Sequence, residues 1–310
     1  MPTPYVTPQM TNNAPTGVSW SIIPFPKATS TQQTAEQMNM CWRATGMVDA
    51  YCNQVLRATV DTERLNGPDY RMTIQNATGN ARLMLSRWPI TQVLQVAVSP
   101  NTFPRSWQIV PSGYYEVERP PIDAYGSTAP TAAGDGGQSI LVSAGYAGWW
   151  NGRQGYTTAT SYLNGWAHSS LTAASSTGTT TLTVDDVTSM TGARVFLYDG
   201  AETEMATVSS VTANANFMLP YGTNTVPAGP GTLTLTGPTA YPHSAGVVVS
   251  AMPQAILWAT ILATALQALE SGITAVTIQN LPGSQTVGGQ GLMALETEFR
   301  DILNPYRRTI

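Results

Sequence analysis

The clearest periodic signal in the sequence is a set of positions spaced alternately by three and four residues near the start of the chain. It comprises Met38, Cys41, Thr45, Val48, Cys52 and Val55. The pattern predicts an amphipathic helix that begins at a capping box formed by Thr34 and Gln37 and continues to about residue 59. Two more helices are expected at 251–269 and 291–304, with the glycine-rich run 283–291 before the second. No single helix can bury its apolar stripe alone, so we expect all three to pack together.

Short runs of β-branched and aromatic residues lie between the helices and predict strands. In 90–98 (ITQVLQVAV) polar and apolar residues alternate roughly, as in a half-buried strand. The expected strands in this half of the chain are 70–75, 81–85, 90–98, 107–109, 114–118 and 139–144. A later series is separated by turn residues at the spacing of a small barrel or sandwich. Its expected strands are 179–184, 193–198, 203–211, 216–219, 232–235 and 246–249.

Changes in composition predict three parts. Residues 1–32 contain six prolines among polar residues and read as an extended arm that becomes ordered only on a neighbouring chain. Residues 33–168 and 250–310 form the expected core. Residues 169–249 carry five carboxylates against a single arginine and read as an inserted β domain. The predicted fold class is therefore α+β, a small helical bundle of N- and C-terminal helices with a β segment and an inserted all-β domain.

Charged residues are scarce, and this scarcity limits the classes of function that the chain can have. They make up 10% of the chain, against about 25% in ordinary soluble domains. Such a surface is covered by neutral polar residues or is buried against other copies. The net charge of −4 argues against a protein that binds nucleic acid by neutralising phosphates, although DNA could slide past such a surface.

The cysteines do not indicate a disulfide or a zinc site, and the most apolar run does not indicate a membrane span. Cys41 and Cys52 lie about 16 Å apart along one predicted helix, so we expect two free, buried thiols and neither a disulfide nor a zinc site. The run 255–269 is too short to span a bilayer and contains Gln267, so we expect a buried core helix and no membrane association.

Residues suited to catalysis or metal binding are few. His168 and His243, the only histidines, flank the predicted insert. Together with Asp199 or Glu202 they could hold a metal ion, but two hydrogen-bonding histidines at the hinge of the insert are the favoured interpretation. The run 283–291 lacks the Lys-Ser/Thr step of a phosphate-binding loop. We therefore expect no enzyme activity, no catalytic or metal-binding residues and no cofactor.

Four segments in a fixed order resemble one protein family. They are 82–96 (RLMLSRWPITQVLQV), 110–117 (VPSGYYEV), 253–262 (PQAILWATIL) and 301–308 (DILNPYRR). Together they resemble the head-to-tail connector (adaptor, or head-completion) proteins of long-tailed bacteriophages and gene transfer agents. The resemblance covers roughly 33–145 and 250–308, and the proline-rich arm and the predicted insert depart from it.

The resemblance implies a structural virion protein. In that family an N-terminal helix, a β segment introduced by a basic-Trp-Pro-hydrophobic step and two C-terminal helices form a subunit, and twelve subunits form a ring below the portal. The step here is Arg87-Trp88-Pro89-Ile90. The expected location is the virion neck, after assembly in the host cytoplasm. The expected function is to extend the DNA channel without specific DNA binding and to provide a docking platform.

The expected partners are other copies of the chain, the portal protein, neck and tail-completion proteins and, through the insert, capsid or decoration proteins. Interface candidates are the aromatic residues and a short basic segment: Trp88, Trp149, Trp150, Tyr156, Tyr162, Trp166, Tyr306, Arg307 and Arg308. The aromatic stretch 146–166 also supports an alternative, a carbohydrate-binding or host-adhesion module of a virion, because sugar rings stack on such side chains.

Overall fold

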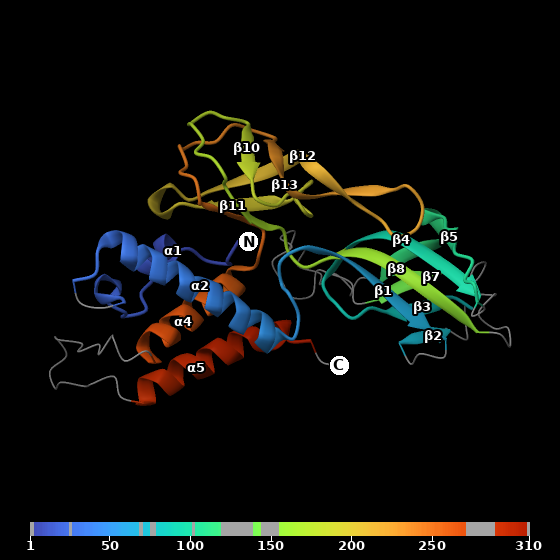
Figure 1. The fold of residues 1–310 in the computed structure, drawn as a ribbon, viewed down its shortest axis with the longest axis horizontal. Helices are drawn as coiled ribbons and strands as arrows, with labels where there is room; N and C mark the ends of the chain where they lie inside the picture. Colours follow the sequence, from blue (N-terminus) through green and yellow to red (C-terminus); the bar gives the residue numbers. More distant parts are fainter. Residues whose placement is uncertain are drawn as a thin grey trace, which may run out of the picture.

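The structure is a computed structural model, and it describes residues 3–24, 27–67, 71–74, 79–100, 103–118, 139–143, 155–270 and 289–308. Helices gather at one end of the described part of the chain, and two sheets that share a core lie at the other end (Figure 1). A third sheet lies over the helices, and one of its hairpins reaches back toward the other two sheets.

Three long helices from distant parts of the sequence pack together at the helical end. They are α2 (Ser30–Cys52), α4 (Gln254–Glu270) and α5 (Gly289–Leu303), and α4 contacts both of the others. Most residues of α4 are buried. Its Ile256 and Leu262 share a core with Val48 of α2 and Phe299 of α5. The expectation that these three helices meet is confirmed.

The predicted limits of α2 are wrong at both ends. The capping box is formed by Thr29 and Gln32: the Thr29 N–H donates to Gln32 Oε1 at 2.9 Å, and the Gln32 N–H donates to Thr29 Oγ1 at 3.3 Å. Helix α2 ends at Cys52 because Asn53 adopts a left-handed conformation, with φ of 55°. Cys41 and Cys52 are free and buried, as expected, and burial raises the pKa of both thiols to about 12.

The N-terminal segment folds on its own subunit. Tyr5 and Val6 are fully buried in the helical core, and α1 (Pro8–Asn13) contacts α2 and α4. Trp20, in the short 3₁₀ helix η1 (Trp20–Ile22), is buried together with Ile23 against α2 and α4. The expectation that this arm becomes ordered only on a neighbouring chain is therefore wrong for 3–24, because its apolar residues bury locally.

Two four-stranded antiparallel sheets form a sandwich. The first has the order β1-β8-β4-β5, with β1 at Thr59–Asn66, β8 at Tyr156–Asn164, β4 at Ile90–Pro100 and β5 at Gln108–Val110. The second has the order β2-β3-β7-β6, with β2 at Met72–Ile74, β3 at Ala81–Met84, β7 at Ser139–Val142 and β6 at Tyr115–Glu118. Leu83 and Ile140 of the second sheet pack against Val96 and Tyr162 of the first. The 3₁₀ helix η2 (Ser112–Tyr114) connects β5 to β6.

The third sheet has six antiparallel strands and a separate core. Its order is β10-β13-β12-β11-β14-β9, with β10 at Thr181–Val184, β13 at Thr225–Leu235, β12 at Glu204–Met218, β11 at Arg194–Tyr198, β14 at Val248–Ser250 and β9 at His168–Ser170. An isolated bridge between Leu171 and Val184 brings its two edges together, so the sheet is nearly closed into a barrel. Its core contains Leu182, Leu197 and Leu233.

The hairpin of β12 and β13 extends beyond the barrel core. Its inner half contributes Val208 and Leu233 to that core, whereas most residues of its outer half are exposed. At the tip, the Tyr221 carbonyl oxygen accepts a hydrogen bond from the side chain of Gln95 in β4. The hairpin thus ties the third sheet to the first (Figure 1).

The predicted fold class, a small helical bundle with a β segment and an inserted all-β domain, is wrong. Strand exceeds helix in the described part of the chain, at 38% against 29%, and a nearly closed six-stranded sheet accompanies the sandwich. The missed strands β1 and β8 explain the error, because they turn a supposed β segment into a two-sheet sandwich with its own core. The domain limits 1–32, 33–168 with 250–310, and 169–249 remain predictions.

Candidate interaction sites

Three of the predicted interface aromatics lie inside the subunit, where the helices meet the first sheet. Trp88, Trp166 and Tyr306 are only 8%, 6% and 6% exposed. The Trp166 ring lies edge-on to both others, with ring centroids 6.2 Å from Trp88 and 5.7 Å from Tyr306. Gln54 accepts a hydrogen bond from the Trp88 N–H and donates one to the Tyr306 carbonyl. These rings join the helices to the sheet and do not offer a surface to another subunit.

The aromatic stretch contributes a buried strand. Tyr162 in β8 is 1% exposed, and its hydroxyl donates to Glu63 Oε2 at 3.3 Å. Tyr156 at the start of β8 is half-buried. Trp149 and Trp150 lie outside the described residues. Tyr162 and Trp166 therefore provide no exposed platform for a sugar ring.

The segment 306–308 lies against α2. The Arg308 N–H donates to the Cys52 carbonyl at 3.0 Å, and the Arg307 guanidinium lies 5.6 Å from the centre of the Tyr51 ring. The η5 turn (Asn304–Tyr306) positions both arginines by continuing directly from α5. Arg307 is exposed and Arg308 is half-buried. Of the predicted basic segment, the Arg307 side chain is the part most open to a partner.

The two histidines occupy separate sites. His168 hydrogen-bonds Ser250 Oγ and the Pro4 carbonyl, each at 2.9 Å. His243 lies between Asp199 Oδ2, at 3.1 Å, and Glu204 Oε1, at 2.7 Å. The favoured interpretation of two hydrogen-bonding histidines is thus confirmed, and no metal-binding cluster occurs among the described residues.

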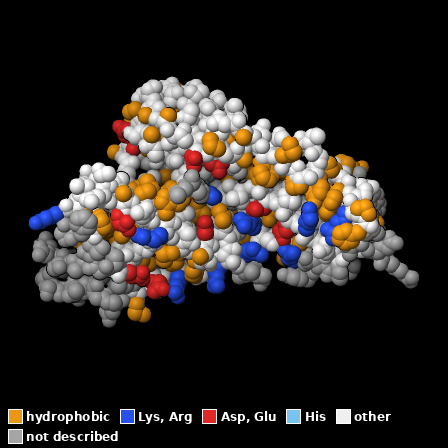
Figure 2. All heavy atoms as spheres, viewed as in Figure 1, with side chains coloured by type: hydrophobic (Ala, Val, Ile, Leu, Met, Phe, Trp, Pro, Cys, Tyr) orange, Lys and Arg blue, Asp and Glu red, His pale blue; other side chains and the backbone are white. Residues whose placement is uncertain are grey.

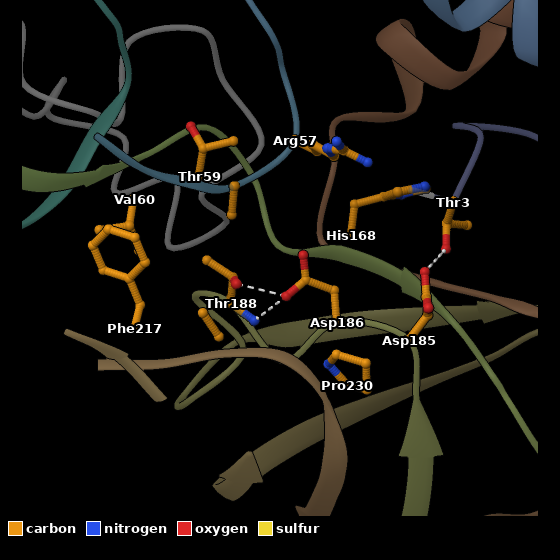
Figure 3. A pocket seen from close by; sticks show the side chains of 12 residues that line it. Thr3, Arg57, Thr59, Val60, His168, Asp185, Asp186, Thr188, Phe217 and Pro230 are labelled. Atoms are coloured by element: carbon orange, nitrogen blue, oxygen red, sulfur yellow. Dashed lines mark hydrogen bonds between the residues drawn. The ribbon is translucent and has the colours of Figure 1, made fainter. Parts of the chain in front are cut away.

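A cavity of about 500 Å³ lies where the N-terminal segment, β1 and the third sheet meet (Figure 3). On one wall, Asp186 Oδ1 accepts hydrogen bonds from the backbone N–H and hydroxyl of Thr188 and from the Gly229 N–H. Asp185 accepts one from the Thr3 hydroxyl at 3.1 Å. These polar groups join Thr3 of the N-terminal segment to the third sheet and fix the 185–188 turn against Gly229, so we interpret the described walls as a structural seam.

A cluster of arginines and aromatic rings lies at the far end of the first sheet. It consists of Arg64, Phe103, Arg105, Trp107 and Tyr221, and is called the arginine–aromatic cluster below. The guanidinium of Arg105 lies 5.4 Å from the Phe103 ring centre and 6.0 Å from that of Trp107. The guanidinium of Arg64 lies 5.7 Å from the Trp107 ring centre. Trp107 also packs on Tyr221, with ring centroids 4.5 Å apart. Figure 2 shows basic and hydrophobic side chains side by side at this end of the molecule.

Sequence reasoning missed the arginine–aromatic cluster. Phe103, Arg105 and Trp107 are spaced by two residues, the spacing of side chains on one face of an extended segment. That spacing could have indicated a surface that combines charge with aromatic rings. Tyr221 could not have been found in this way, because it reaches the cluster only through the β12–β13 hairpin.

Comparisons with known proteins identify no relative. No protein-family model matches the sequence, and neither a curated protein nor a solved structure shows significant similarity to the chain. None of the described helices is long and apolar enough to cross a membrane.

Proposed function

We propose that the chain is a ring-forming structural subunit of a virion neck, placed between portal and tail as a head-to-tail adaptor. The carrying observation is the arrangement around Trp88. The Arg87-Trp88-Pro89 step leads into β4, and Trp88 shares the helical core with α2, α4 and α5. The elements that the resemblance implies, namely the N-terminal helix, the Trp-Pro step and the two C-terminal helices, thus share one hydrophobic core. The β part is much larger than expected.

The surface composition is a second support. The charged fraction of 10% is low for a chain that works alone in water. Large apolar side chains are exposed on two distant elements, with Phe103 at 87% before β5 and Met293 at 68% on α5. Exposed apolar side chains at separate places suit a subunit that contacts neighbours on more than one side.

The proposed partners follow from this role. They are further copies in a twelve-fold ring, the portal protein, neck and tail-completion proteins and, through the third sheet, capsid or decoration proteins. DNA would pass through the channel without specific contacts, which the net charge of −4 favours. The carbohydrate-binding alternative lacks a comparable observation, because Tyr162 and Trp166 are buried.

Imaging of particles that contain this chain tests the proposal. A small tag fused before Met1 should appear, after averaging of neck images, as a ring of densities with the symmetry of the channel directly below the portal. Particles with the same tag on a major capsid protein provide the control for labelling. Density at the tail tip, or a single off-axis copy, would contradict the adaptor role.

A further inference from the structure

The arginine–aromatic cluster contains two arginines without an acidic partner among the described residues. Other arginines of the sandwich pair with carboxylates: Arg71 with Glu63, Arg82 with Glu118 and Arg87 with Asp61. Arg64 and Arg105 instead lie over aromatic rings, and Arg64 Nε donates only to the Tyr221 hydroxyl at 3.1 Å. Stacking leaves guanidinium N–H groups free to bind a carboxylate in a bidentate manner.

The cluster is held in place before any partner arrives. Gln95 of β4 donates to the Tyr221 carbonyl, and Tyr221 packs on Trp107, so the hairpin tip supports the Trp107 ring from one side. The two arginines are positioned over the same ring. Preorganised side chains lose less conformational entropy on binding, which favours a specific contact.

The chemistry of the cluster indicates a protein partner. Phe103 is 87% exposed, and Ile109 in the adjacent strand is 46% exposed. Arginine and tryptophan are enriched among the residues that dominate protein–protein binding energy. Two arginines in a chain of net charge −4 are too few to bind nucleic acid well, because such binding needs several phosphate contacts. The complementary surface should therefore combine carboxylates with at least one apolar side chain.

Helix α5 carries such a surface. Residues 293, 297, 298 and 301 follow a helical spacing away from the buried Phe299 and Leu303. This face presents Met293, which is 68% exposed, together with Thr297, Glu298 and Asp301. Glu298 accepts a hydrogen bond from the Trp258 indole, and Asp301 has no ion pair among the described residues. By contrast, Glu296 pairs with Arg300 on the same helix.

We propose that the arginine–aromatic cluster of one copy docks on the Met293–Glu298–Asp301 face of α5 in a second copy. The two surfaces lie at different ends of the described structure (Figure 1), and they have complementary charge and exposed apolar groups. Contact between two different surfaces of identical subunits is heterologous, and repetition of such a contact forms a ring when the rotation between copies closes and an open filament when it does not. The choice of a second copy as the partner rests on the proposed ring function.

Charge reversal on each surface tests the contact. The cluster variant is Arg64→Glu with Arg105→Glu, and the helix variant is Glu298→Lys with Asp301→Lys. Each variant alone should self-associate at least about tenfold more weakly than the wild type, because like charges then face each other. An equimolar mixture of the two should associate nearly as well as the wild type, since each acidic surface then finds a basic one. Sedimentation velocity measures association, and neck images measure ring occupancy in particles.

Two matched controls change charge elsewhere. Arg194→Glu alters an exposed arginine of β11, and Glu296→Lys alters the other side of α5; both should associate like the wild type. Circular dichroism verifies that every variant is folded. Undiminished association of the cluster variant, or failure of the mixture, would overturn the docking contact while leaving the adaptor role intact. A wild-type chain that forms a ring neither in solution nor in particles would overturn both.

Discussion

The hydroxyl of Tyr5 donates a hydrogen bond to Asp49 Oδ1 over 2.5 Å and anchors the N-terminal segment to α2. The same hydroxyl accepts hydrogen bonds from the backbone N–H groups of Leu56 and Arg57, at 3.0 and 3.2 Å. Burial raises the pKa of Asp49, and the hydrogen bond from Tyr5 partly offsets this rise. One phenol therefore satisfies three polar groups where α2 leads into β1.

We expect Tyr5→Phe to lower the free energy of unfolding by about 1–3 kcal/mol, because the Arg57 N–H loses its hydrogen bond. The Leu56 N–H and Asp49 Oδ1 then keep only the 3.2 Å hydrogen bond between them. Urea denaturation monitored by circular dichroism measures the change. Tyr241→Phe serves as the control, since Tyr241 is 43% exposed, and should change stability by less than about 0.5 kcal/mol. Equal effects of the two substitutions would show that the Tyr5 hydroxyl contributes nothing.

Gly165 should not tolerate a side chain. A methyl group there would lie 2.5 Å from the Arg57 carbonyl oxygen and 2.6 Å from that of Leu56, and its φ is +79°. We expect Gly165→Ala to destabilise by more than about 2 kcal/mol, from backbone strain together with steric overlap.

Gly178→Ala separates these two causes. Gly178 has nearly the same φ, +82°, but nothing lies within 4 Å of the added methyl group. Its substitution should cost only the conformational penalty, about 1–2 kcal/mol. Thermal and urea denaturation of both variants check the difference, and equal losses would argue against the close approach of Gly165 to the Leu56 and Arg57 carbonyls before β1.

His168 should make stability depend on pH. Burial lowers its pKa to about 4 in the folded chain, against about 6.5 in an unfolded one. Above pH 6.5 the ring is neutral in both states. As the pH falls from 6.5 to 4, only the unfolded state gains the proton, so the folded state loses about 3 kcal/mol of relative stability.

The difference in unfolding free energy between the wild type and His168→Asn isolates this contribution. The variant removes the titrating ring, so its stability should fall less steeply over the same pH range. Urea midpoints at half-unit steps from pH 7.5 to 4 measure both slopes. Parallel curves would mean that the imidazole takes up its proton as readily in the folded chain as in the unfolded one.

Four of the six strands of the third sheet, β10 to β13, should be removable. The Gly246 N–H donates to the Leu171 carbonyl at 2.8 Å, so the ends of the segment between them are adjacent, and its core is separate from the helical core. Replacement of 172–245 by a short Gly/Ser linker should preserve the helical circular-dichroism signal, because loop closure adds little free energy. The midpoint of urea denaturation should fall, since Thr3 loses its hydrogen bond to Asp185 and Trp107 loses its contact with Tyr221. Loss of the helical signal would contradict independent folding of the rest.

Strong local periodicity made some elements predictable. The helices expected at 251–269 and 291–304 are found at Gln254–Glu270 and Gly289–Leu303, and the strands expected at 81–85 and 90–98 are found with small shifts. In these segments apolar residues recur locally at the spacing of a helix or a strand, which is enough to indicate the element. The strands expected at 203–211 and 216–219 are instead one long strand, β12, whose outer half is exposed.

Strand β8 was missed because its stabilising contacts are long-range. Its sequence, YTTATSYLN, contains mostly hydroxyl and amide side chains, a composition typical of exposed loops. In the structure β8 lies between β1 and β4, and its polar side chains are buried. Cross-strand partners satisfy several of them, as in the hydrogen bonds of Ser161 with Thr62 and of Asn164 with Asp61. Tyr221 of the arginine–aromatic cluster was missed for the same reason, whereas the local spacing of Phe103, Arg105 and Trp107 was overlooked.

The pairing of α2 with α4 determines when the chain can finish folding during synthesis. About 200 residues separate the two helices, which corresponds to roughly 10–40 s of translation at about 5–20 residues per second. Throughout this interval the apolar face of α2 that packs on α4 is exposed on the nascent chain. Such an exposed apolar face favours aggregation, so premature termination before α4 would yield an aggregation-prone fragment.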